Sequence, residues 1–296
     1  MYKALLPNPE SMVVPSSPCT LVTTIIPTVK GREESLVRAL NSVVAQDLPM
    51  NTSHEIIISC DYQLTNKDYR HLMAYLGNHT IAPDHVSLHL IGRNNERQGV
   101  SEARNRGISS CRGEFIYFLD DDDIAKNNCF QDLLPLLIDE SCNIAAGNWI
   151  LSKQDEQGEI TESKLITNEG HSPDNLLITN FVCIGSFLIR RSSIKKAFNS
   201  SINSHEDWLF LLDNGATSEQ TRFTKSIVAE IIQKSKQEFH HRNPSTSNPS
   251  TIRDYLIVYG LHPSQKHMEK RLSILKALGK LCGVKPSIEL LITQRP

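Results

Sequence analysis

Short apolar runs alternate with amphipathic segments over the first 123 residues of the chain. In one such segment, Leu36, Leu40 and Val43 recur at helical spacing. The pattern predicts strands at Leu21–Ile26, Glu55–Cys60, Val86–Ile91 and Glu114–Leu119, and helices at Arg32–Gln46, Asn66–Gly77 and Gly99–Cys111. Strands joined by helical crossovers form right-handed βαβ units, so we expect an α/β fold with a Rossmann-like, mostly parallel sheet flanked by helices.

The pattern becomes mixed after residue 123. It predicts strands at Asn143–Leu151, Val182–Arg190 and Phe223–Gln233, helices at Ser192–Phe198, His205–Asp213, Thr251–Gly260 and Ser264–Cys282, and polar loops at 152–163 and 237–250. We therefore expect an irregular, proline-rich leader over 1–20 and a ligand-binding half over 21–123. A second half of the same domain would cover 124–250, followed by a C-terminal helical extension over 251–296.

Composition narrows the possible partners. The chain has 296 residues, with 31 basic and 33 acidic side chains well mixed along it, which argues against a nucleic-acid partner held by a broad basic field. The seven cysteines form no Cys-x-x-Cys pair, so reduced, structural thiols are expected. Because no run of about 18 apolar residues occurs, the sequence predicts a soluble and cytoplasmic protein.

The strongest chemical signal is the run of four carboxylates at Asp120–Asp123, directly after the fourth predicted strand. Ligands bind at the carboxyl ends of strands in such sheets. Crowded hard oxygen ligands are typical of Mg²⁺ or Mn²⁺ sites, especially where phosphates complete the coordination. The alternative is a solvated acidic turn that caps the next helix.

Charged residues elsewhere are candidates for the same site. Arg104 and Arg106 lie on the helix before the fourth strand, where they could neutralise phosphates or simply face solvent. Glu206 and Asp207 open an apolar helix; a carboxylate beside an apolar wall can have a raised pKa and act as a general base. Helix capping is the alternative.

Two weaker candidates complete the set. Asp61 follows the second strand and could accept a hydrogen bond from the imide of a uracil ring, although a turn aspartate is the simpler reading. His241 lies beside His240 in a polar loop and could be a neutral metal ligand, with a surface pair as the alternative.

Together these segments resemble the family 2 glycosyltransferases, which have the GT-A type fold. The resemblance covers about residues 21–247 and rests on five segments in order, namely Ile25-Ile26-Pro27-Thr28, Gly99–Gly107 with Ala103-Arg104-Asn105, Gly113–Asp123, Gly185-Ser186 and Glu206-Asp207. The second strand departs from the family pattern, because Cys60-Asp61-Tyr62-Gln63 stands where Asp-Asp-Gly-Ser is usual.

The resemblance implies an inverting transferase that moves a sugar from a nucleoside-diphosphate sugar, of UDP or dTDP type, to a hydroxyl of a carbohydrate, lipid-linked or other acceptor. It implies that residues 21–123 bind the nucleotide sugar and 124–250 the acceptor. The donor residues would be Pro27, Thr28, Asp61, Arg104, Asp120 and Asp121, and the Mn²⁺ or Mg²⁺ ligands Asp122, Asp120 and His241. Asp207 would be the catalytic base. Membrane contact, at the inner face, is expected only for a lipid-linked acceptor.

Competing enzyme classes fit less well. A nicotinamide dehydrogenase needs a Gly-x-Gly-x-x-Gly turn after the first strand, where Pro27–Arg32 stands instead. An aspartyl phosphatase would carry its acidic pair after the first strand, and a sugar nucleotidyltransferase would show a glycine-rich basic loop there. A non-catalytic nucleotide-sugar binder stays open, although such a binder could lose Asp207.

Overall fold

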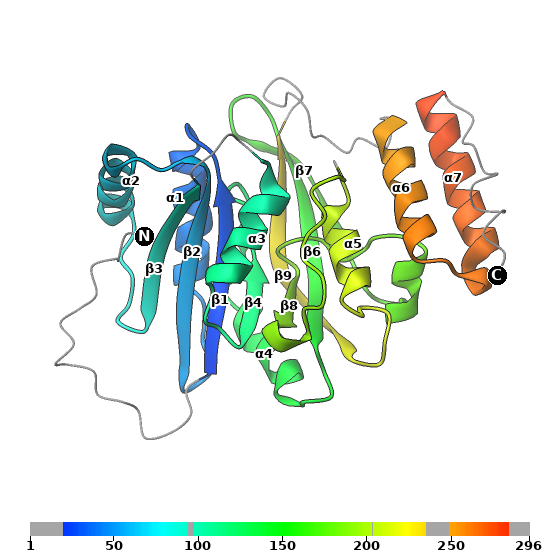
Figure 1. The fold of residues 1–296 in the computed structure, drawn as a ribbon, viewed down its shortest axis with the longest axis horizontal. Helices are drawn as coiled ribbons and strands as arrows, with labels where there is room; N and C mark the ends of the chain where they lie inside the picture. The colour runs from blue at the N-terminus through cyan, green and yellow to red at the C-terminus, as the bar shows by residue number, and fades with distance from the viewer. Residues whose placement is uncertain (1–19, 94–97, 203, 235–248, 284–296) are drawn as a thin grey trace.

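A nine-stranded sheet organises the molecule, with helices on both of its faces (Figure 1). The computed structural model describes residues 20–93, 98–202, 204–234 and 249–283. The strands are β1 (Thr20–Thr28), β2 (Thr52–Gln63), β3 (Val86–Arg93), β4 (Phe115–Phe118), β5 (Ile124–Ala125), β6 (Ile144–Gln154), β7 (Ile160–Ile166), β8 (Phe187–Arg190) and β9 (Thr221–Lys234).

Seven α-helices connect or follow these strands in the described residues. They are α1 (Glu33–Val44), α2 (Asn66–His79), α3 (Val100–Ser110), α4 (Cys129–Ile138), α5 (Glu206–Asp213), α6 (Pro249–Leu261) and α7 (Met268–Cys282). Short 3₁₀ turns occur at Pro173–Leu177, Arg191–Ser193 and Gln265–His267. Helices α6 and α7 lie side by side at the opposite end of the molecule from α2 (Figure 1).

The strand order is β3-β2-β1-β4-β8-β6-β9-β5, with β7 paired to β6. The pairs among β3, β2, β1 and β4 are all parallel, whereas β8 joins β4 and β6 in antiparallel pairs. This arrangement confirms the predicted α/β fold with a parallel first half and a mixed second half. Because β1, β2 and β4 run in the same direction, the segments that follow them emerge at one edge, where Thr28, Asp61 and Asp120 lie.

Two hydrophobic cores sandwich the sheet, because successive residues of a strand point to opposite faces. Ile26 packs with α1, α2 and α4 in one core, which includes Leu36, Leu72 and Phe130. Ile25, its neighbour in β1, belongs to the other core, which holds α5, α6 and α7 residues such as Trp208, Tyr259 and Leu275. The C-terminal helices are therefore part of the main packing. In α7, for example, the buried Arg271 guanidinium stacks over the Tyr259 ring of α6 at 4.4 Å.

Three predictions of secondary structure were wrong. Residues 192–198 are not an α-helix, because side-chain amides take their backbone N–H groups: Asn214 accepts from Lys195 and Lys196, and Asn105 accepts from Phe198. The predicted strand Val182–Arg190 begins only at Phe187. The predicted loop 152–163 instead contains the turn of a β6–β7 hairpin.

Helix α4 was not predicted, and it contains Pro135, which is unfavourable inside a helix. The burial of Phe130, Leu133 and Leu137 in the core shared with α1 and α2 outweighs that local cost. The expected leader (1–20) and the polar loop 237–250 lie almost entirely outside the described residues, and the proposed division into halves remains a prediction.

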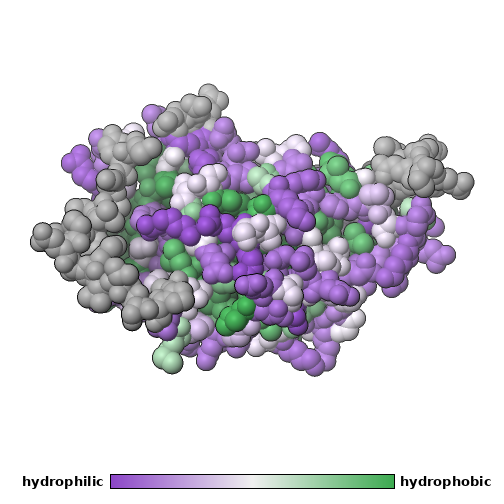
Figure 2. Space-filling view, turned by 60° about the horizontal axis from the view of Figure 1, so that its bottom comes forward, coloured by the Kyte–Doolittle hydropathy of each residue, from purple (hydrophilic) through white to green (hydrophobic). Residues whose placement is uncertain are grey.

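The described surface mixes hydrophobic and hydrophilic side chains. On the face in Figure 2, hydrophobic patches are separated by hydrophilic residues. The largest exposed apolar side chains, such as Met50, Ile81 and Ile138, lie on different elements. Of the described helices, none combines the length and apolar character that a bilayer crossing requires. The six cysteines in the described part of the chain are free thiols, as predicted.

Gly113 is required where the chain passes close to β1 on its way into β4. A Cβ placed there would lie 2.4 Å from Oγ1 and 2.6 Å from the backbone nitrogen of Thr23. We expect Gly113→Ala to lower the free energy of unfolding by about 1–3 kcal/mol, because the neighbouring backbone cannot move aside. Gly77→Ala is the matched control: its Cβ would meet nothing within 4 Å in α2, so stability should rise slightly. Urea unfolding measures the free energy of unfolding of both variants, and equal values would contradict the expected clash at Gly113.

Candidate active site

A large cleft opens at the carboxyl edge of the parallel strands. Its volume is about 1710 Å³, and it is lined by the segments that follow β1, β2 and β4 together with the start of α5. All the sequence-predicted site residues in the described part of the chain line it, namely Pro27, Thr28, Asp61, Arg104, Asp120, Asp121, Asp122 and Asp207. The fold thus brings together residues that are up to 180 positions apart in sequence, from Pro27 to Asp207.

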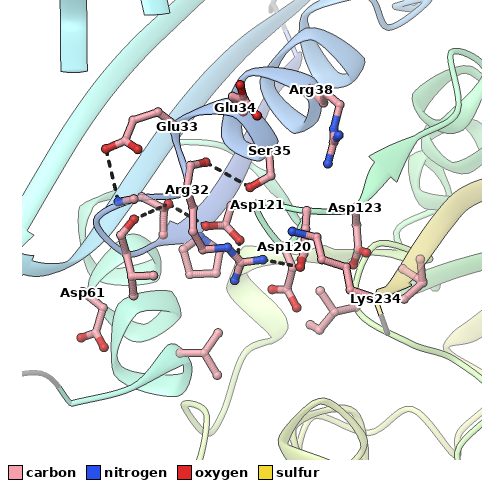
Figure 3. A pocket seen from close by; sticks show the side chains of 18 of the residues that line it. Arg32, Glu33, Glu34, Ser35, Arg38, Asp61, Asp120, Asp121, Asp123 and Lys234 are labelled. Atoms are coloured by element: carbon pink, nitrogen blue, oxygen red, sulfur yellow. Dashed lines mark hydrogen bonds and ion pairs between the residues drawn. The ribbon is translucent and has the colours of Figure 1, made fainter. Parts of the chain in front are cut away.

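The four carboxylates of Asp120–Asp123 are held in different ways. Asp121 accepts a hydrogen bond from Oγ1 of Thr28 at 2.6 Å, and its other oxygen lies 3.2 Å from Arg32. Arg32 also forms an ion pair with Asp122, and Figure 3 shows its side chain reaching toward the acidic run. Asp123 is turned inward and accepts from the backbone nitrogen of Ile232 in β9 at 2.9 Å. Arg32, which also lines the cleft, thus pairs with two of the four carboxylates.

The acidic run carries more negative charge than its surroundings offset. Burial raises the pKa of Asp121 to about 7, although Arg32 opposes this, and the charge of Asp122 raises it further. Burial, with the charge of Asp120, also raises the pKa of Asp122 despite Arg32. Burial and the neighbouring aspartates hold the pKa of Asp123 well above its usual range. A cation bound in this cleft would stabilise the ionised forms of Asp121 and Asp122 and so lower their pKa values.

Arg104 joins the acidic run to the start of α5. Its guanidinium pairs with Asp120 at 2.6 Å through one nitrogen and with Glu206 at 2.9 Å through another, and the side chain is only 1% exposed. Burial opposes the charged form of Arg104, but the two carboxylates outweigh it, so its pKa is raised beyond the usual arginine value. The residue therefore ties the segment after β4 to the segment that carries Asp207.

Asp61 is part of the protein's own hydrogen-bond network. Its carboxylate accepts from the backbone nitrogens of Gln98 and Gly99, at 3.2 and 2.8 Å, and pairs with Arg93 at 2.9 Å. These contacts hold the start of α3 against the end of β2. Asp61 lines the cleft, and it also fixes the chain that leads to Arg104.

Asp207 lies in the first turn of α5 and is held by three donors. Its oxygens accept from the backbone nitrogens of Ile184 and Trp208, at 3.3 and 2.7 Å, and from the side-chain amide of Asn180 at 3.3 Å. Burial raises the pKa of Asp207 to about 7, and the charge of Glu206 adds to the effect while Arg104 opposes it. A carboxylate with a pKa near neutrality is suited to accept a proton.

The carboxylates fit a divalent cation whose coordination is completed by substrate phosphates. In the described ranges, no group of three or more His, Cys, Asp or Glu side chains is arranged to hold a metal by itself. Mg²⁺ and Mn²⁺ are, however, commonly held by one or two carboxylates plus substrate phosphates. The Arg32 guanidinium already occupies the place of a cation between Asp121 and Asp122. His241 lies outside the described residues.

Several cleft residues were missed in the sequence. Arg32 had a usable signal, since it is a basic residue beside Gly31 in the short segment between the first predicted strand and the helix that follows. Lys234, which Figure 3 places beside the acidic run, lies at the end of β9. Asn180, which reaches the site through its hydrogen bond to Asp207, lies outside the strands and helices. Nothing in the local pattern relates either of them to the cleft.

Solved structures share the overall fold of this chain. The crystal structure of S. aureus TarS 1–349 superposes with a TM-score of 0.55 at 14% identity, covering 88% of this chain and 72% of that one. TarS 1–349 in complex with UDP-GlcNAc gives a TM-score of 0.55 at 13% identity over 92% of this chain and 84% of that one. The chain therefore has the GT-A type α/β fold that the sequence predicted.

Residues 23–198 match the family described as glycosyl transferase family 2, and the chain belongs to this family. An uncharacterized glycosyltransferase of Haemophilus influenzae is 32% identical over 117 residues, which are 39% of this chain and 45% of that protein. The putative teichuronic acid biosynthesis glycosyltransferase TuaG of Bacillus subtilis is 25% identical over 42% of this chain and 49% of its own length. The chain thus matches about half the length of these relatives.

The bridge formed by Arg104 gives a prediction about stability. Arg104→Met should lower the free energy of unfolding by about 2–4 kcal/mol, because Asp120 and Glu206 would face each other without a cation; the partial exposure of Asp120, 35%, limits the loss. The exposed Arg70→Met on α2 is the control and should change stability by less than about 0.5 kcal/mol. Urea unfolding measures the free energy of unfolding of both variants, and equal losses would contradict a stabilising role for the Arg104 bridge.

Proposed function

We propose that this protein is an inverting glycosyltransferase that uses a nucleoside-diphosphate sugar, with Asp207 as its general base. One observation carries the proposal: the Asp207 carboxylate, whose pKa burial raises to about 7, lines the same cleft as the acidic run after β4. Family membership supports it, since residues 23–198 match glycosyl transferase family 2. A base and a cation-binding group are the two parts that a single displacement on a sugar nucleotide needs.

The donor we propose is of UDP or dTDP type. TarS, whose fold this chain shares, has been crystallised with UDP and with UDP-GlcNAc. In this chain, Pro27, Thr28 and Asp61 border the cleft where the nucleoside would lie, and Asp120 is the most exposed carboxylate whose contacts are described in the run. We assign Asp120 and Asp121 to the donor, with Arg104 positioning Asp120 and offering positive charge near the diphosphate.

The proposed cation is Mn²⁺ or Mg²⁺, held through Asp122 and Asp120. When bound, it would neutralise the charge that builds on the departing nucleoside diphosphate. The chain's own contribution is to keep these oxygens together. Arg32 has to leave Asp122 for the cation to reach that carboxylate, because its guanidinium pairs with it.

Asp207 would remove the proton of the acceptor hydroxyl as that oxygen attacks the anomeric carbon. The two backbone N–H groups and the Asn180 amide fix the orientation of its carboxylate. Attack from the side opposite the diphosphate gives inversion, by the same geometry as in inverting glycosidases.

Asp207→Asn should reduce transfer by about 10²- to 10⁴-fold while the affinity for UDP stays the same, because the amide keeps the shape but accepts no proton. In the wild type, kcat/KM should rise about tenfold per pH unit below pH 7 and level off above it, since burial raises the pKa of Asp207 to about 7 and only the ionised form is a base. UDP release from a panel of UDP- and dTDP-sugars measures the rates.

Asp213→Asn is the matched control for this experiment. It makes the same substitution on the same helix, but Asp213 pairs with Lys196 and His262 away from the cleft. Its rate should stay within a few-fold of the wild type. If Asp207→Asn keeps more than a tenth of the wild-type rate, Asp207 is not the base, and the non-catalytic reading gains support.

Removal of the metal tests the cation site. We expect the affinity for UDP, measured by calorimetry with Mn²⁺, to fall at least about tenfold in EDTA. Arg32→Ala should raise the affinity for Mn²⁺ in the presence of UDP by roughly threefold to tenfold, because one ion pair no longer competes for Asp122. Arg38→Ala, which removes the same charge from the same cleft, is the control and should change it less. Equal UDP affinity with and without EDTA would refute the metal site.

A further inference from the structure

A second, smaller pocket lies behind Asp207. Its volume is about 210 Å³, and it is lined by Trp149, Asn180, Val182, Cys183, His205, Asp207 and Tyr255. Cys183, His205 and Asp207 also line the large cleft, so the two spaces meet at the proposed base. At about 30 Å³ for each water molecule, the pocket holds the volume of about seven waters, which is the scale of one monosaccharide.

The walls of this pocket are fixed by contacts inside the protein. The Trp149 indole donates to the carbonyl oxygen of Phe181 at 3.0 Å, and the Tyr255 hydroxyl lies 3.2 Å from Oγ1 of Thr179. Asn180 accepts from the backbone nitrogen of Val182 at 3.2 Å while its amide donates to Asp207. The aromatic rings and the polar groups are thus held in place before any ligand binds.

His205 has an unusual backbone at the mouth of the pocket. Its φ is +64°, one of two positive values among the described residues other than glycine. Such a conformation costs about 1–2 kcal/mol for an ordinary side chain and is often retained at functional sites. It places the imidazole against the Tyr255 ring, at 5.1 Å between centroids.

A buried chain of hydrogen bonds sets the tautomer of His205. The Ser204 hydroxyl donates to Oδ2 of Asp254 at 2.5 Å, because a carboxylate can only accept. That hydroxyl has a single proton, so Nδ1 of His205, 3.0 Å away, must donate to it. Nδ1 then carries the proton in a neutral ring and Nε2 is left as an acceptor. Burial lowers the pKa of His205, although Asp254 and Glu206 oppose this, which favours the neutral ring.

We propose that this pocket binds the acceptor as a single sugar ring that carries two neighbouring hydroxyl groups, one facing Asp207 and one donating to Nε2 of His205. The inference rests on the proposed function, because it assigns the acceptor side of the same site. An apolar ring face suits Trp149 and Tyr255, and hydroxyl groups suit the acceptor nitrogen, the carboxylate and the amide. A lipid chain would offer no hydrogen-bond donor to Nε2 of His205.

The pocket depends on parts of the chain outside the family match. His205, Asp207, Asp254 and Tyr255 all lie after residue 198, where that match ends. Helix α6 supplies both Asp254, which sets the tautomer, and Tyr255, which forms a wall. The acceptor preference is therefore a property of this chain and its C-terminal helices.

The test uses the full chain with UDP and Mn²⁺, and methyl hexopyranosides with their monodeoxy analogues as probes. Calorimetry first measures UDP binding, and saturation-transfer NMR then measures the Kd of each glycoside. We expect at least one glycoside to bind, and the loss of one particular hydroxyl to weaken it about tenfold, as for one neutral hydrogen bond. In His205→Ala that same deoxy analogue should bind as well as its parent, because the partner is gone.

Control variants separate this role from a general loss of structure. His79→Ala, at the exposed end of α2, should keep the tenfold discrimination, and His205→Ala should keep the wild-type affinity for UDP. Trp149→Ala should weaken every glycoside alike. If UDP binds but no glycoside does, or if His205→Ala still discriminates tenfold, the inference is overturned while the proposed function stands. If UDP itself fails to bind, the proposed function falls, and the inference with it.

Discussion

The crowding of carboxylates at one edge of the sheet is the constraint on which the rest of the site depends. Asp120–Asp123 follow β4 directly, and Glu206 and Asp207 open α5 on the other side of the cleft. Such a concentration of negative charge is unfavourable in a half-buried place unless cations or hydrogen-bond donors offset it. Two arginines do this in different ways.

Arg104 is the permanent partner and Arg32 the replaceable one. Arg104 is fully enclosed and bridges the two acidic segments, so the geometry between the acidic run and the start of α5 is part of the folded core. Arg32 is more exposed and approaches from the turn after β1. A ligand with its own positive charge could take the place of Arg32 without disturbing the core, whereas Arg104 could not be displaced without separating β4 from α5.

The C-terminal helices also hold the segment that carries Asp207. They pack through Tyr255, Tyr259 and Leu275 into the same core as Trp208 of α5, so the helix that carries Asp207 is held by them. Asp254, buried on α6, reaches back to Ser204 just before α5. The polar contacts near Asp207 are thereby set from a segment about fifty residues later in the chain.

The sequence by itself determined the βαβ half, because hydrophobic periodicity and the alternation of strands and helices are local properties. Strands that are joined by helical crossovers then pair in parallel. It also located Asp120–Asp123 and Asp207, since acidic residues after an apolar strand or before an apolar helix stand out locally. Only the tertiary structure decided which charges meet. The pairing of Arg32 with Asp122, the bridge from Arg104 to Glu206 and the chain from Asp254 to His205 join residues that no local pattern connects. Helix α4 is a related case. The sequence displays only the low helix propensity of Pro135, whereas the burial of the helix against the sheet, which outweighs it, is a tertiary effect.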